Sequence, residues 1–337
     1  MDKATNWSSP RFYVPAIVLL GLALLPVYSM VAGQPFYVTL FSRIMIFALA
    51  ALGLNLILGY GGLVSFGHAL YLGVGAYAVG ILSFHGITNG WVHLAAALGI
   101  GIVTASLIGT IVLRTSGMTF IMITLAFAQM GYFFVVSLKA YGGDDGLTID
   151  NRSSMVLFDL SNHTVLYYAI LVCLAGVFLV FTRLIGSRFG MVLRGVKSNE
   201  RRMLALGFPT FRYKLVGYVI SAQVCVLAGF FLANLTKFAS PSYMVWQVSG
   251  DLIVMAVLGG MGTLFGPVIG AILYLVVEEF LSSLNPGWFP KVEDVLNKHW
   301  LALMGLFVIL MVLGFRKGLY GYLVEREQKK LEKRAQS

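Results

Sequence analysis

Long apolar segments separated by short polar ones run through almost the entire chain. A helix that crosses a membrane needs about 20 consecutive apolar residues. This pattern predicts spans near 14–33, 36–58, 64–84, 93–113, 118–138, 164–184, 213–235 and 299–315. A further apolar run, 249–284, is interrupted by GGMGTLFGP and divides into 249–259, which is short enough to be a half-helix, and 264–284. The pattern predicts an all-α polytopic membrane protein with about 8–10 transmembrane segments and Gly-rich broken or re-entrant helices.

Composition supports this class. The 337 residues are 58% hydrophobic and 11% charged, whereas soluble domains contain roughly 25% charged residues. The net charge of +10 lies in loops and tails beside the spans, so we relate it to topology and membrane lipid, not to nucleic acid. Cys173 and Cys225 lie inside apolar segments, which favours neither a disulfide framework nor a metal site. No separate soluble domain is expected.

The distribution of charge predicts the topology. Lys and Arg are enriched in cytoplasmic loops. With the tail 1–13 and the loop 185–212 in the cytoplasm, alternation of the spans also places the tail 317–337 there and the Asp-rich loop 139–163 outside. Both termini are therefore predicted to be cytoplasmic, and 14–316 forms the transmembrane domain. The first apolar run is too long for a signal peptide, so we interpret it as a retained span.

The segment Ser187 to Lys214 carries seven cations and one acid, Glu200. Ser198 or Asn199 can cap a short helix that begins at Glu200, and Gly207 followed by Pro209 would end it. Apolar anchors within this segment are Val196, Met203, Leu204 and Leu206. Two interpretations follow from the residues: a docking surface for a partner that drives the membrane domain, or a basic loop that only fixes topology.

Residues 53–80 combine many glycines with polar side chains at membrane depth. Polar groups in lipid need protein or water partners, so these side chains are candidates for a translocation path, the alternative being tight helix packing. The candidates are Asn55, Ser65, His68, Tyr71 and Tyr77. A second glycine cluster, 258–271, contains LGGMGTLFG, which is similar to LGYGGLVSFG in the first and suggests a repeated broken-helix element.

Charged residues within the spans are few. Arg43 is close enough to the outer end of its span to snorkel, Asp251 begins a short segment, and Glu278 and Glu279 lie near the outer end of theirs. A deeply buried carboxylate, which a proton-coupled carrier would need, is not evident. The chain contains no Gly-Lys dipeptide and hence no P-loop, so ATP hydrolysis on this chain is not expected.

Four segments in the same order identify a family resemblance: NLILGYGGLVSFGHALYLGVGAYAVGIL, YGGDDGLT, RFGMVLRGVKSNERRMLALGF and MAVLGGMGTLFGPVIGA. They resemble the LivM-type permease subunits of branched-chain amino acid ABC importers over about residues 40 to 315. The resemblance implies a bacterial inner-membrane protein that pairs with a LivH-type permease, two cytoplasmic ATPases and a periplasmic solute-binding protein. It implies no cofactor and no catalytic residue on this chain.

The resemblance also assigns roles to residues. Glu200, Ala205 and Gly207 match the coupling-loop pattern E-x-x-x-x-A-x-G, although Arg201, Arg202 and Met203 replace residues that are often alanine. The expected ATPase-coupling residues are Arg194, Glu200, Arg201, Met203, Leu204, Ala205 and Gly207. The outer sequence GGDDG matches the family pattern G-G-x-D-G, and we expect Asp144 and Asp145 to meet the binding protein.

The expected function is therefore a permease subunit of an ATP-driven importer for branched-chain or related amino acids. Three alternatives remain at this point. The first is a permease of a urea or short-chain amide ABC importer. A secondary transporter and a channel without energy coupling are the other two.

Overall fold

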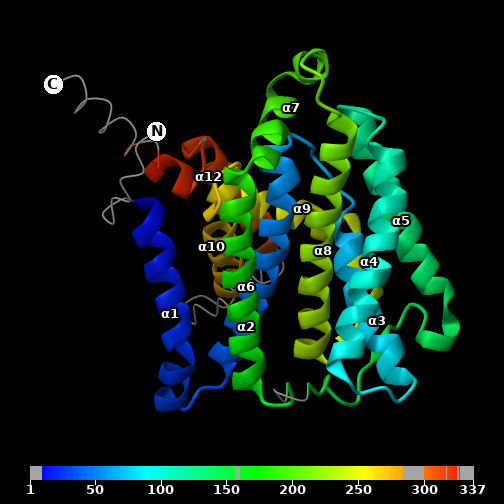
Figure 1. The fold of residues 1–337 in the computed structure, drawn as a ribbon. Helices are drawn as coiled ribbons and strands as arrows, with labels where there is room; N and C mark the ends of the chain where they lie inside the picture. The colour runs from blue at the N-terminus through cyan, green and yellow to red at the C-terminus, as the bar shows by residue number, and fades with distance from the viewer. Residues whose placement is uncertain (1–9, 156–159, 284–299, 316, 325, 327–337) are drawn as a thin grey trace.

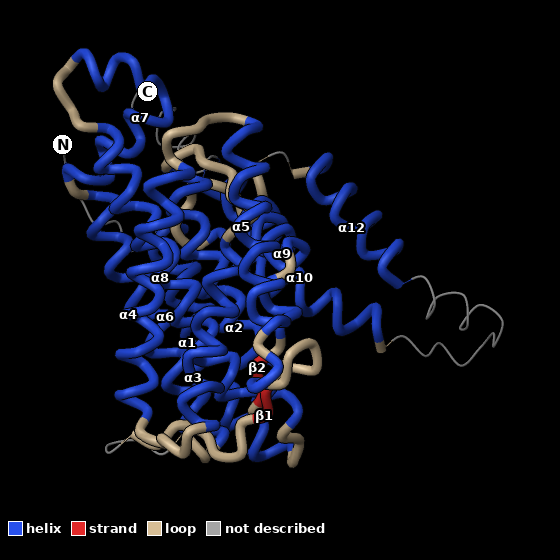
Figure 2. The backbone as a smooth tube through the Cα atoms, turned by 90° about the vertical axis from the view of Figure 1, so that its right-hand side faces the viewer, coloured by secondary structure: helices blue, strands red, loops and turns tan. Residues whose placement is uncertain are grey.

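The computed structural model describes residues 10–155, 160–283, 300–315, 317–324 and 326. Within them are ten apolar helices: nine pack side by side in one bundle (Figure 1), and α12 (Trp300–Gly314) lies tilted at its side (Figure 2). Helix α7 (Arg188–Ala205) stands beyond one end of the bundle (Figure 1). The ten are α1 (Pro10–Ala32), α2 (Phe36–Asn55), α3 (His68–Phe84), α4 (Gly90–Val112), α5 (Met118–Ser137), α6 (His163–Gly186), α8 (Thr210–Thr236), α9 (Trp246–Gly259), α10 (Gly266–Ser282) and α12 (Trp300–Gly314).

Seven helices in the described chain are long and apolar enough to cross a membrane. Helices α3, α9 and α10 are shorter, with 17, 14 and 17 residues. All three adjoin the Gly-rich interruptions, because backbone that leaves the helix there takes residues away from the regular segment. The prediction of an all-α polytopic membrane protein with broken helices is confirmed.

The core of the bundle is built on α2 and α8. Of the most apolar window in each, 78% of α2 and 67% of α8 is buried, against 22% for α1 and α5. Small residues permit this close packing: Gly229 of α8 lies against the backbone of α3 at Leu72 with no room for a Cβ atom. The outer helices α1, α4, α5 and α12 expose apolar side chains, as expected of surfaces that meet lipid or other membrane helices.

Two sequence predictions of element boundaries are wrong. The predicted span 64–84 begins only at His68, because α2 continues through a π-helical turn, Leu56–Tyr60, and irregular backbone follows to Gly67. The loop 185–212 holds more than one short helix, since helical structure already begins at Arg188. Residues 1–9 and 327–337, in the predicted cytoplasmic tails, lie outside the described residues.

The end of the bundle opposite α7 carries the little β structure in the described chain (Figure 2). Strand β1 (Leu147–Thr148) pairs antiparallel with β2 (Phe238–Ala239), and a 3-10 turn, Pro241–Met244, leads into α9. This pairing joins the loop 139–163 to the end of α8. The Asp-rich loop and the basic α7 segment therefore lie at opposite ends of the bundle.

Candidate functional site

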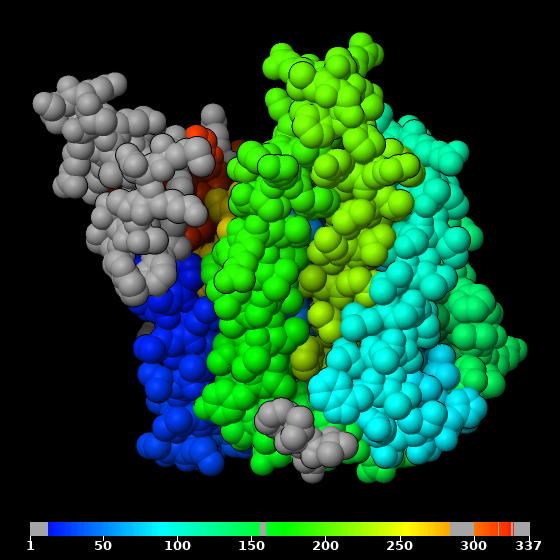
Figure 3. All heavy atoms as spheres, viewed as in Figure 1, coloured from blue at the N-terminus to red at the C-terminus, as the bar shows by residue number. Residues whose placement is uncertain are grey.

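Helix α7 projects beyond the spans and consists of two parts (Figures 1 and 3). At Asn199 the backbone is extended, with φ −161° and ψ 99°. The Asn199 side-chain oxygen accepts a 2.9 Å hydrogen bond from the backbone N–H of Arg202, which is the geometry of an N-cap. The predicted helix after residue 199 is therefore confirmed, with Asn199 and not Ser198 as its cap.

The far end of this short helix is closed by Gly207. Its φ of +84° is left-handed, a conformation that is unfavourable for a side chain. The N–H of Gly207 donates to the carbonyl of Leu204 and that of Phe208 to Met203, so both carbonyls at the helix end are satisfied. Local chemistry thus defines both ends of the segment that we call the tip helix, Glu200 to Ala205.

The tip helix is braced against α8 through Glu200. Its carboxylate lies 2.6 Å from the Lys214 ammonium and accepts a 3.0 Å hydrogen bond from the Thr210 hydroxyl. Burial acts to raise the pKa of the Glu200 carboxyl, but the bonds from Lys214 and Thr210 outweigh it, and the pKa lies below its ordinary value. The brace is therefore charged at neutral pH and is lost only as the pH falls through that lowered pKa.

The remaining coupling-loop candidates divide into exposed and anchored residues. Leu204 is 53% and Leu206 65% exposed. Arg201, Arg202, Ala205 and Gly207 are exposed as well, and Met203 is partly exposed. Arg194 instead donates to the carbonyls of Ile185 and Gly190, both at 3.2 Å, and so joins α7 to the end of α6. Val196 is buried, so its proposed role as an anchor for a partner is wrong.

The two Gly-rich interruptions, which are 200 residues apart in sequence, meet in space. The Asn55 side chain donates to the carbonyl of Thr263 at 2.8 Å and accepts from the N–H of Gly262 at 3.1 Å. A Cβ atom on Gly59 would lie 2.8 Å from the Cα atom of Gly262. Gly62 and Gly262 both have positive φ, +72° and +75°. Asn55 thus satisfies backbone groups that the second interruption leaves outside any helix.

Lys197 connects α7 to these interruptions. Its ammonium donates a 2.6 Å hydrogen bond to the carbonyl of Gly59, and its aliphatic chain covers Gly62, where a Cβ atom would lie 2.9 Å from Lys197 Cγ. A side chain two residues before the Asn199 cap therefore touches the backbone that contacts Gly262. This chain of contacts joins the tip helix to both broken helices.

Three translocation-path candidates, Ser65, His68 and Tyr71, lie in one buried polar cluster, in which the His68 ring contacts the rings of Tyr71 and Tyr218 edge-on. His68 Nε2 lies 2.9 Å from Ser221 Oγ and Nδ1 lies 2.9 Å from Ser65 Oγ. The Ser221 hydroxyl donates to the carbonyl of Gly53 at 2.6 Å, so its oxygen must accept from His68 Nε2–H, and Nδ1 is the acceptor. Tyr71 donates to Tyr218 at 3.1 Å. In this structure the network fastens α3 to α2 and α8.

The other two candidates differ from each other. Asn55 is buried and forms the hydrogen bonds to Thr263 and Gly262 that join the two Gly-rich interruptions. Tyr77 lines an apolar groove of about 490 Å³ between α3, α4 and α5, and its hydroxyl has no hydrogen-bond partner within the described chain. All five path candidates are thus buried in this chain's own packing, and a contact with cargo stays a prediction.

The loop 139–163 presents the binding-protein candidates at the opposite end. Gly142, Gly143 and Gly146 all have positive φ and build the tight turn that precedes β1. Asp144 and Asp145 are exposed, and Asp144 accepts a hydrogen bond of 3.3 Å from the Tyr132 hydroxyl. No cluster of three or more His, Cys, Asp or Glu able to hold a metal is found in the described residues.

A bundle of apolar helices whose two broken members meet beneath a projecting capped helix defines the class: a polytopic membrane transport component. Comparison gives the particular family. Residues 36–313 match the model of the branched-chain amino acid transport system / permease component family, and the chain belongs to that family. No solved structure matches the chain.

Relatives include both permease types. The permease protein LivM of the high-affinity branched-chain amino acid transport system of Salmonella typhimurium is 25% identical over 90% of this chain and 77% of its own length. A probable LivM from Methanocaldococcus jannaschii is 26% identical over 80% of this chain and 87% of its own. The LivH protein of Escherichia coli is 26% identical over 80% of this chain and 91% of its own. This chain is a permease component.

Sequence reasoning missed several contacts of the site. The sequence assigns no individual role to Lys197 or Lys214 within the basic segment, yet each bonds across the fold. Arg43 was expected to snorkel, and its guanidinium instead pairs with Glu278. For Arg43 and Lys214 the available signal was a cation placed at or inside the end of an apolar segment, whereas Lys197 lies within the basic loop and had no such signal. Their partners lie 138, 14 and 235 positions away in sequence and could not be read from spacing.

Proposed function

We propose that this chain is one of two permease subunits of an ATP-driven importer for branched-chain or related amino acids in a bacterial inner membrane. The tip helix is the element that docks on a cytoplasmic ATPase. The observation that carries this proposal is a helix closed at both ends by its own residues, exposing Leu204 beyond the spans and braced to α8 by Glu200. An exposed leucine that follows Arg201 and Arg202 on the same short helix fits an apolar anchor in an acidic protein cleft.

The other partners follow from the family and its relatives. LivH-type relatives align with this chain over 91% of their length, which supports a pseudo-symmetric pair of related permeases. ATP hydrolysis would take place on two separate subunits, and a soluble binding protein would deliver the cargo. The test is reconstitution. Proteoliposomes that contain the two permeases and the two ATPase subunits should import leucine when ATP and the binding protein are added. Uptake that needs only an ion gradient would contradict the proposal.

The placement of the two ends gives a labelling prediction. In a background without Cys173 and Cys225, a cysteine at Asp150 should react with an impermeant thiol reagent added to intact spheroplasts. A cysteine at Ser198 should react only after the membrane is opened, because the α7 end is the basic one. Both positions are exposed, so burial does not explain a difference. The opposite pattern would reverse the proposed topology.

The Asp pair gives a second prediction. Asp144→Lys together with Asp145→Lys should weaken docking of the binding protein several-fold at low salt and much less at high salt, since rim charges act mainly on association. ATPase activity without the binding protein should not change. The matched control is Asp150→Lys, which alters an exposed charge of the same loop beyond β1. Equal docking of the double variant and wild type at low salt would contradict the assignment.

A further inference from the structure

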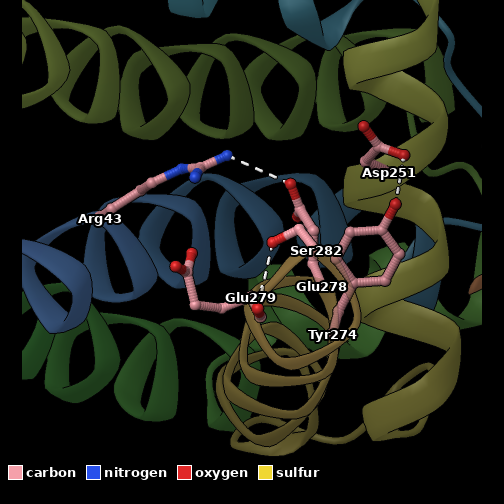
Figure 4. A network of polar contacts seen from close by, with 6 residues as sticks. All are labelled: Arg43, Asp251, Tyr274, Glu278, Glu279 and Ser282. Atoms are coloured by element: carbon pink, nitrogen blue, oxygen red, sulfur yellow. Dashed lines mark hydrogen bonds and ion pairs between the residues drawn. The ribbon is translucent and has the colours of Figure 1, made fainter. Parts of the chain in front are cut away.

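The acidic side chains that the structure describes within the ten apolar helices lie together on one side of the bundle. They are Asp251 on α9 and Glu278 and Glu279 on α10, and they share this site with Arg43 on α2 (Figure 4). At 1.5 Å per residue, Arg43, Asp251 and Glu278 each lie roughly 6–11 Å inside the nearest helix end. Three helices therefore place charged groups at one level, in the half of the bundle away from α7.

The contacts within this charged cluster are few. Arg43 Nη2 lies 3.4 Å from Glu278 Oε1, and these side chains are 45% and 25% exposed. The Tyr274 hydroxyl donates a 2.7 Å hydrogen bond to Asp251. The Arg43 guanidinium also lies 5.9 Å from the centre of the Phe47 ring, which orients it.

The ion pair between Arg43 and Glu278 is long and has only one contact, so it is a weak structural link between α2 and α10. A well-formed bond between guanidinium and carboxylate has a length of about 2.7–2.9 Å and often uses two nitrogens. Here one contact of 3.4 Å leaves most of the Arg43 fork available to a second carboxylate. The cluster has three carboxylates for one guanidinium, so it also has room for a cation.

Such groups are unfavourable against lipid hydrocarbon, by a few kcal/mol each on insertion scales. Charged side chains that remain partly exposed at this level indicate a surface that meets water or cargo. An amino acid in its zwitterionic form offers the complementary pair, an ammonium and a carboxylate on one carbon.

We propose that the charged cluster lines the translocation path and binds the amino-acid zwitterion, with Asp251 and Glu278 facing its ammonium and Arg43 its carboxylate. This assignment rests on the proposed function, because it needs an amino acid as cargo. The cluster recognises the ammonium and carboxylate groups that all amino-acid cargo shares. It therefore selects for a zwitterion, and other surfaces select for the cargo side chain.

The test must separate cargo binding from a packing role of the ion pair. It uses the complete importer in proteoliposomes with L-leucine as the probe. The double variant Arg43→Glu with Glu278→Arg keeps an ion pair between the same two positions but exchanges its signs. We expect wild-type assembly and thermal stability, ATP hydrolysis still stimulated by the binding protein, and leucine uptake lowered at least tenfold. The control Asp150→Asn removes an exposed carboxylate at the same end of the bundle but outside the cluster, and it should transport within twofold of wild type.

The outcomes are distinct. If the double variant imports leucine within twofold of wild type, the Arg43–Glu278 pair serves only helix packing, and the proposal is overturned. An equal loss in Asp150→Asn would reveal general sensitivity to charge at this end of the bundle and overturn it as well. If the exchanged pair does not assemble, Asp251→Asn decides by the same tenfold criterion, because asparagine can still accept from Tyr274. Wild-type importer that shows no ATP-dependent leucine uptake would contradict the proposed function itself, before any variant is compared.

Discussion

Leu204→Asp is expected to release the ATPase subunits from the permease pair and to abolish uptake. Leu204 is exposed on the tip helix, and an apolar anchor buried at such an interface contributes about 2 kcal/mol or more, or roughly a 30-fold change in affinity. A buried carboxylate adds a desolvation penalty. Affinity purification of the permease pair followed by quantification of the bound ATPases measures the effect.

The control for this variant is Leu204→Met, which keeps an apolar side chain of similar volume and should retain the ATPases. Gly207→Val tests the shape of the same element. Residue 207 has a φ of +84°, which is strained for any residue with a side chain even though the surrounding space is open. Valine at this position should therefore destabilise the end of the tip helix by roughly 1 kcal/mol or more and change its shape. A Leu204→Asp complex that retains both ATPases and transports normally would leave α7 as a topology signal only.

Lys197→Met is expected to uncouple ATP hydrolysis from transport. The variant keeps the aliphatic cover over Gly62 but removes the 2.6 Å bond to the carbonyl of Gly59. Because that bond joins α7 to the backbone that meets Gly262, its loss should let the tip helix move without moving the broken helices. We expect normal ATPase binding, near-normal hydrolysis and uptake reduced at least tenfold, measured as ATP hydrolysed per leucine imported.

Arg183→Met is the matched control, because it removes an exposed cation from the last turn of α6 at the same end of the bundle. It should leave the ratio of hydrolysis to uptake unchanged. A Lys197→Met importer with the wild-type ratio would show that the link to Gly59 carries no movement. Loss of ATPase binding in this variant would instead mean that Lys197 belongs to the docking surface.

Local features of this protein were predictable from its sequence. Apolar runs define spans because lipid offers no hydrogen-bond partner to the backbone. The cap at residue 199 or 198 and the end at Gly207 were predictable because both use side chains and backbone within a few positions. The Gly-rich interruptions were also evident, since glycine weakens a helix wherever it stands.

Boundaries near the interruptions were not predictable to the residue. The span expected from residue 64 starts at His68, because hydropathy does not distinguish apolar residues in irregular backbone from those in a helix. The additional helix before Asn199 was missed for a related reason. Its three cations, Arg188, Arg194 and Lys197, hide an amphipathic pattern in which Val192, Leu193 and Val196 are buried.

The sequence by itself therefore determined the membrane class, the charge asymmetry and the capped tip helix, all of which depend on neighbours along the chain. Only the tertiary structure decided which distant groups meet. The Asn55 bridge to Gly262, the Lys197 bond to Gly59 and the Arg43 pair with Glu278 each join residues more than 100 positions apart. Such pairs form because helix packing brings polar groups of distant segments together, and one sequence does not encode that packing in any local spacing.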